Sequence, residues 1–318
     1  MTYPAIPNEP TGIRRISDFL DWHAERTPHA EAVVLGELRL SYAELKVRVD
    51  SLALALLAAG VRKGDRVATL ATPHPEYFVS FLAAVSIGAI WVGLNPRYQP
   101  RELTYVIGDC EPAVLITRTR IGERDYSNEI AQMRSSAPSI RRVVALDGAA
   151  GPGIERMEEF EEGGRNVDAA SLAAARAACG DRDACLIVYT SGSTGQPKGA
   201  VLHHEGITQV CLMQNRIWPV ARQRVVNFLP INHVGCVVDL SCPTLAAGGC
   251  IVFMERFEPA ESMALTARER ISWWISVPSV FQMQLASPGF ENHDLSKLEL
   301  IVWEGAAMPE QIIRRLLK

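Results

Sequence analysis

Residues 185–202 read CLIVYTSGSTGQPKGAVL, and the interpretation of the whole chain starts from this stretch. CLIVYT (185–190) has the apolar, β-branched composition of a buried strand, and AVL (200–202) predicts a second strand that returns alongside it. Glycines, hydroxyl side chains and one lysine stand between the two strands. In open α/β sheets ligands bind beyond the carboxyl ends of the strands, so this turn is where chemistry is expected.

The turn at residues 189–199 has the composition of a phosphate-binding loop. Its glycines allow backbone N–H groups to converge on an anion, its hydroxyls add donors, and Lys198 adds a mobile positive charge. The loop differs from the G-x-x-x-x-G-K-[ST] motif of P-loop nucleotidases, because Pro197 precedes the lysine and Gly199 follows it. A strand also follows the loop where that motif requires a helix.

The rest of the chain alternates predicted strands and helices around this loop. Strands are predicted at 66–71, 89–94, 113–117, 142–146, 225–229, 250–254, 273–277 and 298–303, and helices at 42–59, 100–110, 203–217, 236–247, 259–270 and 279–286. This alternation predicts an α/β fold made of two doubly wound, mostly parallel sheet subdomains. We place the first at residues 1–175 and the second, with loop 189–199, at residues 176–318.

Residues 77–94 are uncharged over 18 positions, the length at which a transmembrane helix becomes a candidate. Pro75 suits the first turn of a helix and Gly88 suits the end of one. We therefore predict a buried helix followed by a buried strand, each too short to cross a membrane.

Composition narrows the classes of function. Of the 318 residues 48% are hydrophobic and 21% charged, which is typical of a soluble globular protein. The net charge of −4 lacks the basic excess of a nucleic-acid-binding protein. The seven cysteines form no C-x-x-C motif, so buried free thiols are predicted and not a zinc site or a disulfide scaffold. No secretory signal is visible at the start, and a cytoplasmic location is expected.

The segment YTSGSTGQPKG (189–199) resembles the phosphate-binding signature of the adenylate-forming (AMP-binding) superfamily, in particular its acyl- and aryl-CoA synthetases. LRLSYAEL (38–45), GVRKGDRVAT (60–69), GAIWVGLNPRYQPRELTYVIGD (88–109) and VPSVFQMQL (277–285) are also similar to segments of that family. The resemblance implies that a carboxylic acid and ATP form an acyl-adenylate and pyrophosphate, after which the acyl group passes to a thiol. ATP, Mg²⁺ and CoA are thus implied as the cofactors and co-substrates.

The resemblance also assigns residues to the nucleotide. By match to the signature, the phosphate contacts fall on Thr190, Ser191, Gly192, Ser193, Thr194, Gly195 and Lys198. Thr194 is implied beside Mg²⁺, and both Thr194 and Lys198 are implied as catalytic. Their chemical task is to neutralise the charge that develops on the leaving pyrophosphate.

A histidine after the next strand, His233, is implied in the acid pocket and as a catalytic residue besides Thr194 and Lys198. His233, within FLPINHVG (228–235), matches the histidine that lines the family's acyl pocket beside the carboxylate, with Val234 next to it. Asn232 stands where most relatives carry an aromatic residue. Peptide-synthetase adenylation domains place an aspartate close to this point, whereas here Asp239 lies further into the predicted helix. This difference favours a simple carboxylic acid over an amino acid.

The turn EGAAM (304–308) resembles the Gly-Gly-Ala-Pro turn that packs against adenine in the family. Gly305 and Ala306 match that turn, while Ala307 replaces its proline and Glu304 replaces a glycine, so we expect the packing against adenine to differ. Trp273 and Trp274 are predicted in the core. Trp303 is predicted either in the core or at the border of the acyl pocket.

Several parts of the family pattern are not found in these 318 residues. They are a Tyr-Gly-x-Thr-Glu segment, a ribose-binding aspartate, a hinge, and a C-terminal domain with a second lysine. We therefore expect an N-terminal portion, ending before the barrel-like subdomain, that is inactive or weakly active alone. The residues leave open a carrier-protein thiol as acceptor, or a nucleotide- or acyl-binding fragment without turnover. They also leave open the acid, the oligomeric state and the origin of the chain end.

Overall fold

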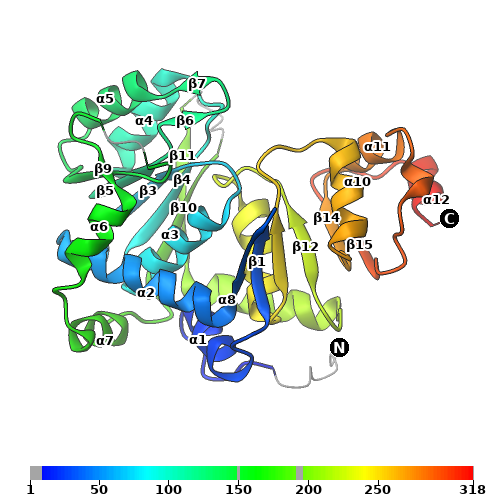
Figure 1. The fold of residues 1–318 in the computed structure, drawn as a ribbon, viewed down its shortest axis with the longest axis horizontal. Helices are drawn as coiled ribbons and strands as arrows, with labels where there is room; N and C mark the ends of the chain where they lie inside the picture. Colours follow the sequence, from blue (N-terminus) through cyan, green and yellow to red (C-terminus); the bar gives the residue numbers. More distant parts are fainter. Residues whose placement is uncertain (1–8, 149–150, 191–195, 318) are drawn as a thin grey trace.

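The structure, a computed structural model, describes residues 9–148, 151–190 and 196–317 (Figure 1). Up to residue 177 the elements are α1 (Ser17–Arg26), β1 (Glu31–Leu35), β2 (Leu38–Ser41), α2 (Tyr42–Ala58), β3 (Arg66–Leu70), α3 (Pro75–Ser86), β4 (Ile90–Leu94), α4 (Pro100–Cys110), β5 (Val114–Thr117), β6 (Arg120–Ile121), β7 (Arg124–Asp125), α5 (Ser127–Ser136), β8 (Arg142–Ala145), β9 (Glu155–Arg156), α6 (Met157–Gly164) and α7 (Ala169–Ala177).

Beyond residue 177 the alternation of strands and helices continues. The elements are β10 (Ala184–Thr190), β11 (Lys198–His203), α8 (His204–Ile217), β12 (Arg224–Asn227), the π-helix η1 (Gly235–Ser241), α9 (Cys242–Ala246), β13 (Cys250–Phe253), α10 (Pro259–Arg268), β14 (Trp273–Ser276), α11 (Pro278–Leu285), the 3₁₀ turn η2 (Phe290–Asn292), β15 (Leu300–Trp303) and α12 (Glu310–Leu316).

Two mixed but mainly parallel sheets carry the fold, which confirms the predicted α/β class. One sheet has the strand order β11-β10-β4-β3-β5-β8-β9, and the other has the order β15-β14-β12-β13-β1-β2. In each of these two sheets every pair is parallel except one, β10 with β11 and β1 with β2. The antiparallel β10–β11 pair confirms the returning strand predicted after the loop, with Val188 opposite Ala200.

The two sheets do not follow the predicted division into residues 1–175 and 176–318. Strands β1 and β2, from the first part of the chain, complete the sheet built mainly from residues 224–303. Conversely, β10 and β11 complete the sheet built mainly from residues 66–156. An apolar strand pattern shows that a strand is buried but does not select its partner, which is why sequence order suggested a simpler division.

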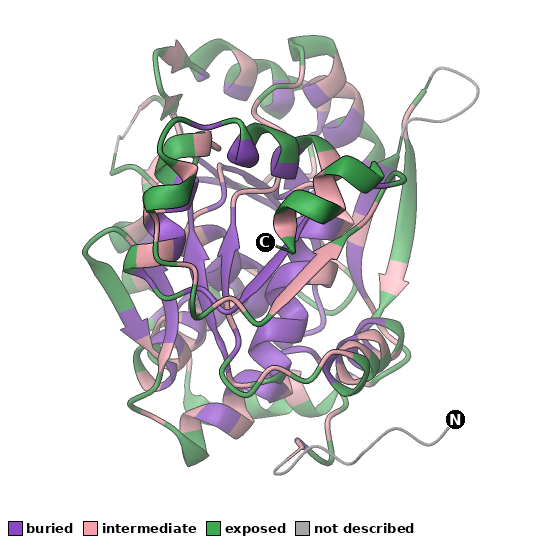
Figure 2. Ribbon diagram, turned by 90° about the vertical axis from the view of Figure 1, so that its right-hand side faces the viewer, coloured by how far each residue is buried: buried purple, intermediate pink, exposed green. Residues whose placement is uncertain are grey.

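Buried side chains concentrate in the strands and in the helices between the two sheets, as the purple ribbon in Figure 2 shows. The largest apolar cluster fills this central layer, with contributions from α1, α2, α3, α8 and α9. A second cluster joins α4 and α5 to the outer face of the seven-stranded sheet. A third joins α10, α11 and α12 to the outer face of the six-stranded sheet. The order of layers is therefore helix, sheet, helix, sheet, helix.

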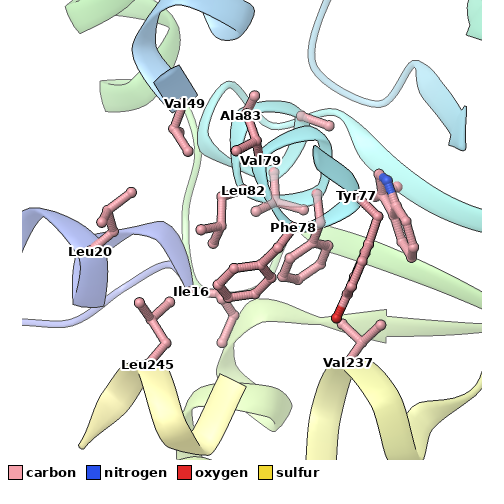
Figure 3. Close-up of a cluster of buried hydrophobic side chains, with 14 of the residues drawn as sticks. Ile16, Leu20, Val49, Tyr77, Phe78, Val79, Leu82, Ala83, Val237 and Leu245 are labelled. Atoms are coloured by element: carbon pink, nitrogen blue, oxygen red, sulfur yellow. The ribbon is translucent and has the colours of Figure 1, made fainter. Parts of the chain in front are cut away.

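Helix α3 lies at the centre of the molecule, and this explains its uncharged sequence. All its residues except Glu76 are buried. In Figure 3 its side chains Phe78 and Leu82 lie in one apolar cluster with Leu20 of α1 and Leu245 of α9. The helix ends before Gly88, whose φ of 78° requires a residue without a side chain, and β4 follows. The predicted helix and strand are confirmed, and among the described residues no helix combines the length and apolar composition needed to cross a membrane.

The segment predicted as one helix at 236–247 is instead divided. Residues 235–241 form the π-helix η1, and α9 follows from Cys242. Pro243, at the start of α9, has no N–H to donate to the preceding turn, which is consistent with a change of helix type at this point. The wider turn of a π-helix changes which side chains face the neighbouring strand ends.

The seven cysteines are free and buried, as predicted. Burial raises the pKa of the Cys236 thiol to about 12 and that of Cys179 to about 11. These thiols are therefore protonated near neutral pH and act as small apolar side chains.

Candidate functional site

The two segments that flank the predicted phosphate loop are hydrogen-bonded to helix α4. Tyr189, the last but one residue of β10, donates its hydroxyl to Asp109 at 2.5 Å, and Tyr105 donates to the carbonyl of Pro197 at 3.1 Å. Burial and the hydrogen bond to Asp109 raise the pKa of Tyr189, so it remains a donor. Both legs of the hairpin are thus fixed to the same helix.

The described part of the loop presents its polar groups to solvent. Thr190 and Lys198 face each other in the β10–β11 register, and both are exposed. At Gly199 a Cβ atom would lie 2.9 Å from the Ile187 side chain, which limits this position to glycine. The other predicted phosphate contacts, Ser191, Gly192, Ser193, Thr194 and Gly195, lie outside the described residues.

The turn that carries His233 lies against strand β4, the neighbour of β10. A Cβ atom on Gly93 of β4 would lie 2.5 Å from the carbonyl oxygen of Ile231, so the two backbones are in close contact. Asn232 donates its side-chain amide to the Tyr98 hydroxyl at 3.1 Å. Since β4 pairs with β10, strand β4 connects the loop hairpin and the His233 turn.

A fully buried asparagine that the sequence analysis did not single out holds the next part of the site. Asn227, the last residue of β12, donates to the Cys236 carbonyl at 3.0 Å and to the Ser241 hydroxyl at 2.9 Å. Ser241 in turn shares a 2.7 Å hydrogen bond with Tyr77 of α3, whose hydroxyl lies beside η1 in Figure 3. These bonds fix η1 relative to β12 and to the central helix layer.

The His233 ring has a defined hydrogen-bonding direction. Its Nδ1 atom accepts a hydrogen bond from the backbone N–H of Gly235 at 3.0 Å. A neutral imidazole that accepts at Nδ1 carries its proton on Nε2. The side chain is exposed, so the Nε2–H group can donate to a ligand. Val234 beside it is half-buried and packs against the central apolar cluster.

Two carboxyl groups lie near this histidine. A Cβ atom placed on Gly235 would lie 3.1 Å from His233 Nδ1 and 3.3 Å from Glu304 Oε1, so both side chains border the same glycine. Burial raises the pKa of Asp239 on η1, an effect that His233 opposes. Burial and then the charge of Asp239 raise the pKa of Glu304. The position where the family pattern has a glycine therefore holds a partly buried acid.

The turn after β15 is otherwise open to solvent. Gly305 has a φ of 76°, and a Cβ atom there would lie 3.5 Å from Val277. Ala306 and Ala307 are exposed. Trp303 is 40% exposed and is not a core residue, whereas Trp273 and Trp274 are buried as predicted.

A small cavity behind β14 does not offer space for an acyl group. It measures about 10 Å³, close to the space of a single water molecule, and is lined by Val226, Phe228, Ser262, Thr266, Trp274, Ile275, Ser276, Val280, Phe281 and Gln284. Within the described residues, Ser276 Oγ and Gln284 Oε1 are buried without a hydrogen-bond partner. One ordered water is the occupant that fits these groups.

Comparison with known proteins places this arrangement in a family. A sequence profile described as AMP-binding enzyme matches residues 20–318. The chain belongs to the AMP-binding enzyme family. This match confirms the resemblance that was identified from residues 189–199.

Relatives of this AMP-binding enzyme include CoA ligases. The chain is 33% identical over 297 residues to a feruloyl-CoA synthase of an Amycolatopsis species, covering 92% of this chain and 55% of the relative. It is 31% identical over 307 residues to an indoleacetate–CoA ligase of Aromatoleum aromaticum, covering 95% and 57%. The chain thus spans about half the length of the curated relatives it matches.

Solved structures show the same fold. The N-terminal domain of FACL13 from Mycobacterium tuberculosis matches with a TM-score of 0.81 at 24% identity, covering 96% of this chain and 73% of that one. ATP-bound MatB from Rhodopseudomonas palustris matches with a TM-score of 0.76 at 26% identity, covering 94% and 57%. The two-sheet architecture of this AMP-binding enzyme is therefore that of acyl-CoA ligase N-terminal domains.

The structure brings some of the predicted site residues together. His233 and Gly305 follow the carboxyl ends of β12 and β15 in the six-stranded sheet. Glu304, the neighbour of Gly305, lies with its carboxyl against Gly235, and the His233 ring borders the same glycine. Lys198 and Thr190 lie on the seven-stranded sheet, and strand β4 lies between them and the His233 turn. Among the described residues no group of three metal-ligating side chains occurs, and Thr194, the predicted Mg²⁺ contact, lies outside them.

Proposed function

We propose that this protein is an ATP-dependent carboxylate–CoA ligase that forms an acyl-adenylate and then an acyl-CoA thioester from a fatty or aromatic acid. One observation carries the proposal: a hairpin with the YTSGSTGQPKG sequence and a donor histidine stand on either side of β4, in a member of the AMP-binding family. The named CoA ligases among its relatives support the choice of reaction.

In this proposal the β10–β11 hairpin holds the phosphates of ATP. Lys198 and the hydroxyl of Thr190 sit at the two ends of the loop, and the glycines between them allow backbone N–H groups to face the anion. Mg²⁺, where ATP brings it, would be held by the phosphates and by Thr194, and it would neutralise charge on the departing pyrophosphate. Lys198 contributes a positive charge to the same task.

His233 is proposed to orient the acid. With Nδ1 already occupied by the Gly235 N–H, its Nε2–H can donate to one oxygen of the substrate carboxylate. The other oxygen then attacks the α-phosphorus of ATP, the bond to the bridging oxygen breaks, and pyrophosphate leaves. The gain from such positioning is mainly entropic, because it converts a two-molecule encounter into a reaction within one complex.

We propose that the turn at Gly305, Ala306 and Ala307 binds the adenine, and that Val234 and Trp303 border the acyl group. The exposure of Trp303 and of the two alanines supports this, because these groups are open to a ligand. The buried free thiols support a location in a reducing compartment such as the cytoplasm, which cell fractionation would test.

A carrier-protein thiol is the second candidate acceptor. A segment of a linear gramicidin synthase from Brevibacillus parabrevis is 28% identical to this chain over 295 residues. That similarity keeps open the transfer of the acyl group to a protein-bound thiol, while the feruloyl-CoA synthase and the indoleacetate–CoA ligase favour CoA.

The proposal is tested in two steps. Calorimetry with residues 1–318 should show ATP binding, and an absence of binding would overturn the nucleotide assignment. Supplied with acid, ATP, Mg²⁺ and CoA, the full-length protein should release AMP and form a thioester. Formation of acyl-adenylate without a CoA thioester would instead support the carrier-protein acceptor. Because the chain spans about half of its relatives, we expect residues 1–318 by themselves to turn over weakly or not at all.

A further inference from the structure

Two carboxyl groups in the proposed acid pocket have no internal partner. Asp239 projects from η1 and Glu304 follows β15, and the Glu304 carboxyl lies against the same glycine as the His233 ring. Among the residues that the structure describes, neither side chain makes a hydrogen bond or an ion pair. The position of the pocket was proposed from the carboxyl ends of the strands and from membership of the family, and not from these two acids.

Glu269, a buried acid elsewhere in the molecule, is paired. Glu269 accepts a hydrogen bond from Arg39 at 2.6 Å and also pairs with Arg224. Although burial opposes it, these two arginines lower the pKa of Glu269. Asp239 and Glu304 show the opposite shift, because burial raises the pKa of both carboxyls and the charge of Asp239 raises that of Glu304 further. An unpaired, partly buried carboxylate costs free energy that a suitable ligand can recover.

Apart from the Nε2–H of His233, which is assigned to the substrate carboxylate, the groups left without partners at this site are acceptors. Besides the two carboxyls, the side-chain oxygen of Asn232 is buried without a hydrogen-bond partner in the described structure. The amide of Asn232 is already donated to Tyr98, and Nδ1 of His233 is already occupied by Gly235. A ligand that fills this space must therefore bring donors.

We propose that the acid accepted here carries a hydrogen-bond donor, a hydroxyl or an amino group, that binds Asp239 and Glu304 while its carboxylate faces His233. This inference rests on the proposed function and narrows its substrate class. Asp239 lies four residues beyond Gly235 on η1, about one helical turn from the point where His233 meets Gly235. A donor held there is separated from the carboxylate by a short spacer such as a ring. Plain hydrocarbon acids leave both carboxyls unpaired and bind less well.

Stable mimics of the acyl-adenylate test the inference on residues 1–318. The probes are adenosine 5′-N-acylsulfamates that carry a benzoyl, a hydroxybenzoyl or an aminomethylbenzoyl group, with the substituent at each ring position. We expect the best donor-bearing probe to bind at least about tenfold more tightly than the benzoyl probe, as one buried hydrogen bond to a charged group allows. Comparison of the hydroxybenzoyl probe with the aminomethylbenzoyl probe identifies whether the site prefers a hydroxyl or an ammonium donor.

Variants separate the two carboxyls from the rest of the pocket. Glu304→Gln and Asp239→Asn keep the shape of each side chain and remove its charge. Each should reduce the preference for the donor-bearing probe to about threefold or less while the benzoyl probe binds as before or better. Glu299→Gln, an exposed acid at the start of the same strand region, is the matched control and should keep the preference. If Asp239→Asn fails to fold, Glu304→Gln in the solvent-facing turn still gives the answer.

The outcomes distinguish this inference from the proposed function. If none of the probes binds, the proposed function fails and the inference fails with it. If all probes bind with equal affinity, the proposed function stands and the inference is overturned. A preference that survives in both Glu304→Gln and Asp239→Asn would also overturn it, because the donor would then bind elsewhere.

Discussion

At the scale of single residues, Lys198 is a side chain whose proposed role in ATP binding can be tested separately from stability. It is exposed on the edge strand β11, so its removal should leave the free energy of unfolding within about 0.5 kcal/mol of the original value. In the full-length protein Lys198→Ala should weaken ATP binding at least about tenfold and slow acyl-adenylate formation about 100-fold, because the positive charge proposed to face the leaving phosphates is lost. Calorimetry and pyrophosphate exchange measure the two effects.

The control for this variant is Lys297→Ala, which removes another exposed lysine. It should change neither ATP binding nor stability. A large drop in melting temperature for Lys198→Ala would contradict our interpretation and would make the lysine structural.

His74 provides a prediction for pH dependence. It caps α3 through Nδ1, which accepts the Glu76 N–H at 3.1 Å, and burial followed by the charge of Arg118 lowers its pKa from 6.5 to about 4. The unfolded chain therefore takes up the proton first, and stability falls as the pH drops from about 6.5 toward 4. His74→Asn keeps an N-cap acceptor but does not titrate. At pH 5 this variant should be more stable relative to wild type than at pH 7.5, by about 1–2 kcal/mol.

Urea unfolding at the two pH values measures this difference. Equal pH dependence in His74→Asn and wild type would show that other groups, such as buried His204 with its pKa lowered to about 4, dominate acid unfolding.

At the scale of elements, Gly93 connects strand β4 to the His233 turn. A methyl group there would lie 2.5 Å from the Ile231 carbonyl oxygen and 2.8 Å from the Trp91 ring. Gly93→Ala should therefore destabilise the protein by about 2–3 kcal/mol and move the His233 turn. Affinity for an acyl-adenylate mimic should fall more than affinity for ATP, because the proposed site of the nucleotide phosphates lies on the other side of β4.

Gly206→Ala is the matched control for this steric argument. This glycine lies in α8 with open space around its Cβ position, and alanine there should stabilise the helix by about 0.5–1 kcal/mol. A Gly93→Ala protein as stable as wild type would contradict the close contact.

Local sequence signals predicted most of the elements. Ser41 and Glu44 form the capping box that begins α2, with the Ser41 N–H donating to Glu44 at 2.8 Å, and Pro100 begins α4 as predicted. Signals of this kind act within a few residues, so they are visible without a fold. The change to a π-helix at residues 235–241 was not predicted, because it depends on the packing of η1 against β12 and α3.

The candidate site was only partly visible in the sequence. The loop and His233 were predicted from motifs, but the approach of Glu304 to His233 joins residues that are 71 positions apart. Asn227 was overlooked for the same reason, since its two bonds to η1 appear only after β12 and η1 have packed. The one signal of this contact in the sequence was Glu304 itself, which stands where the family turn has a glycine.

At the scale of the whole molecule, an ion pair joins the strand ends of the two sheets. Arg118 follows β5 and meets Glu255, which follows β13, at 2.5 Å, and Thr72 after β3 donates to the same carboxylate at 2.7 Å. The pair is partly exposed, so we expect a modest contribution. Glu255→Gln should keep the Thr72 bond and lower the free energy of unfolding by about 1 kcal/mol or less, and less still in high salt.

Glu310→Gln serves as the control, because its pair with Arg314 is almost fully exposed and lies within α12. Urea unfolding at low and high salt should show an effect for Glu255→Gln only. A loss far above 1 kcal/mol would mean that Glu255 has a larger role between the sheets than one surface ion pair.

The exchange of strands between the two sheets also governs how the chain can be divided. A cut between residues 175 and 176 would give each piece a sheet that lacks two strands held by the other piece. Each piece alone would expose unpaired strand edges and apolar surface, and so would be prone to aggregate. Produced together, the same pieces could complement each other and restore both sheets. The topology thus makes this chain a natural candidate for a split protein whose halves report on each other's presence.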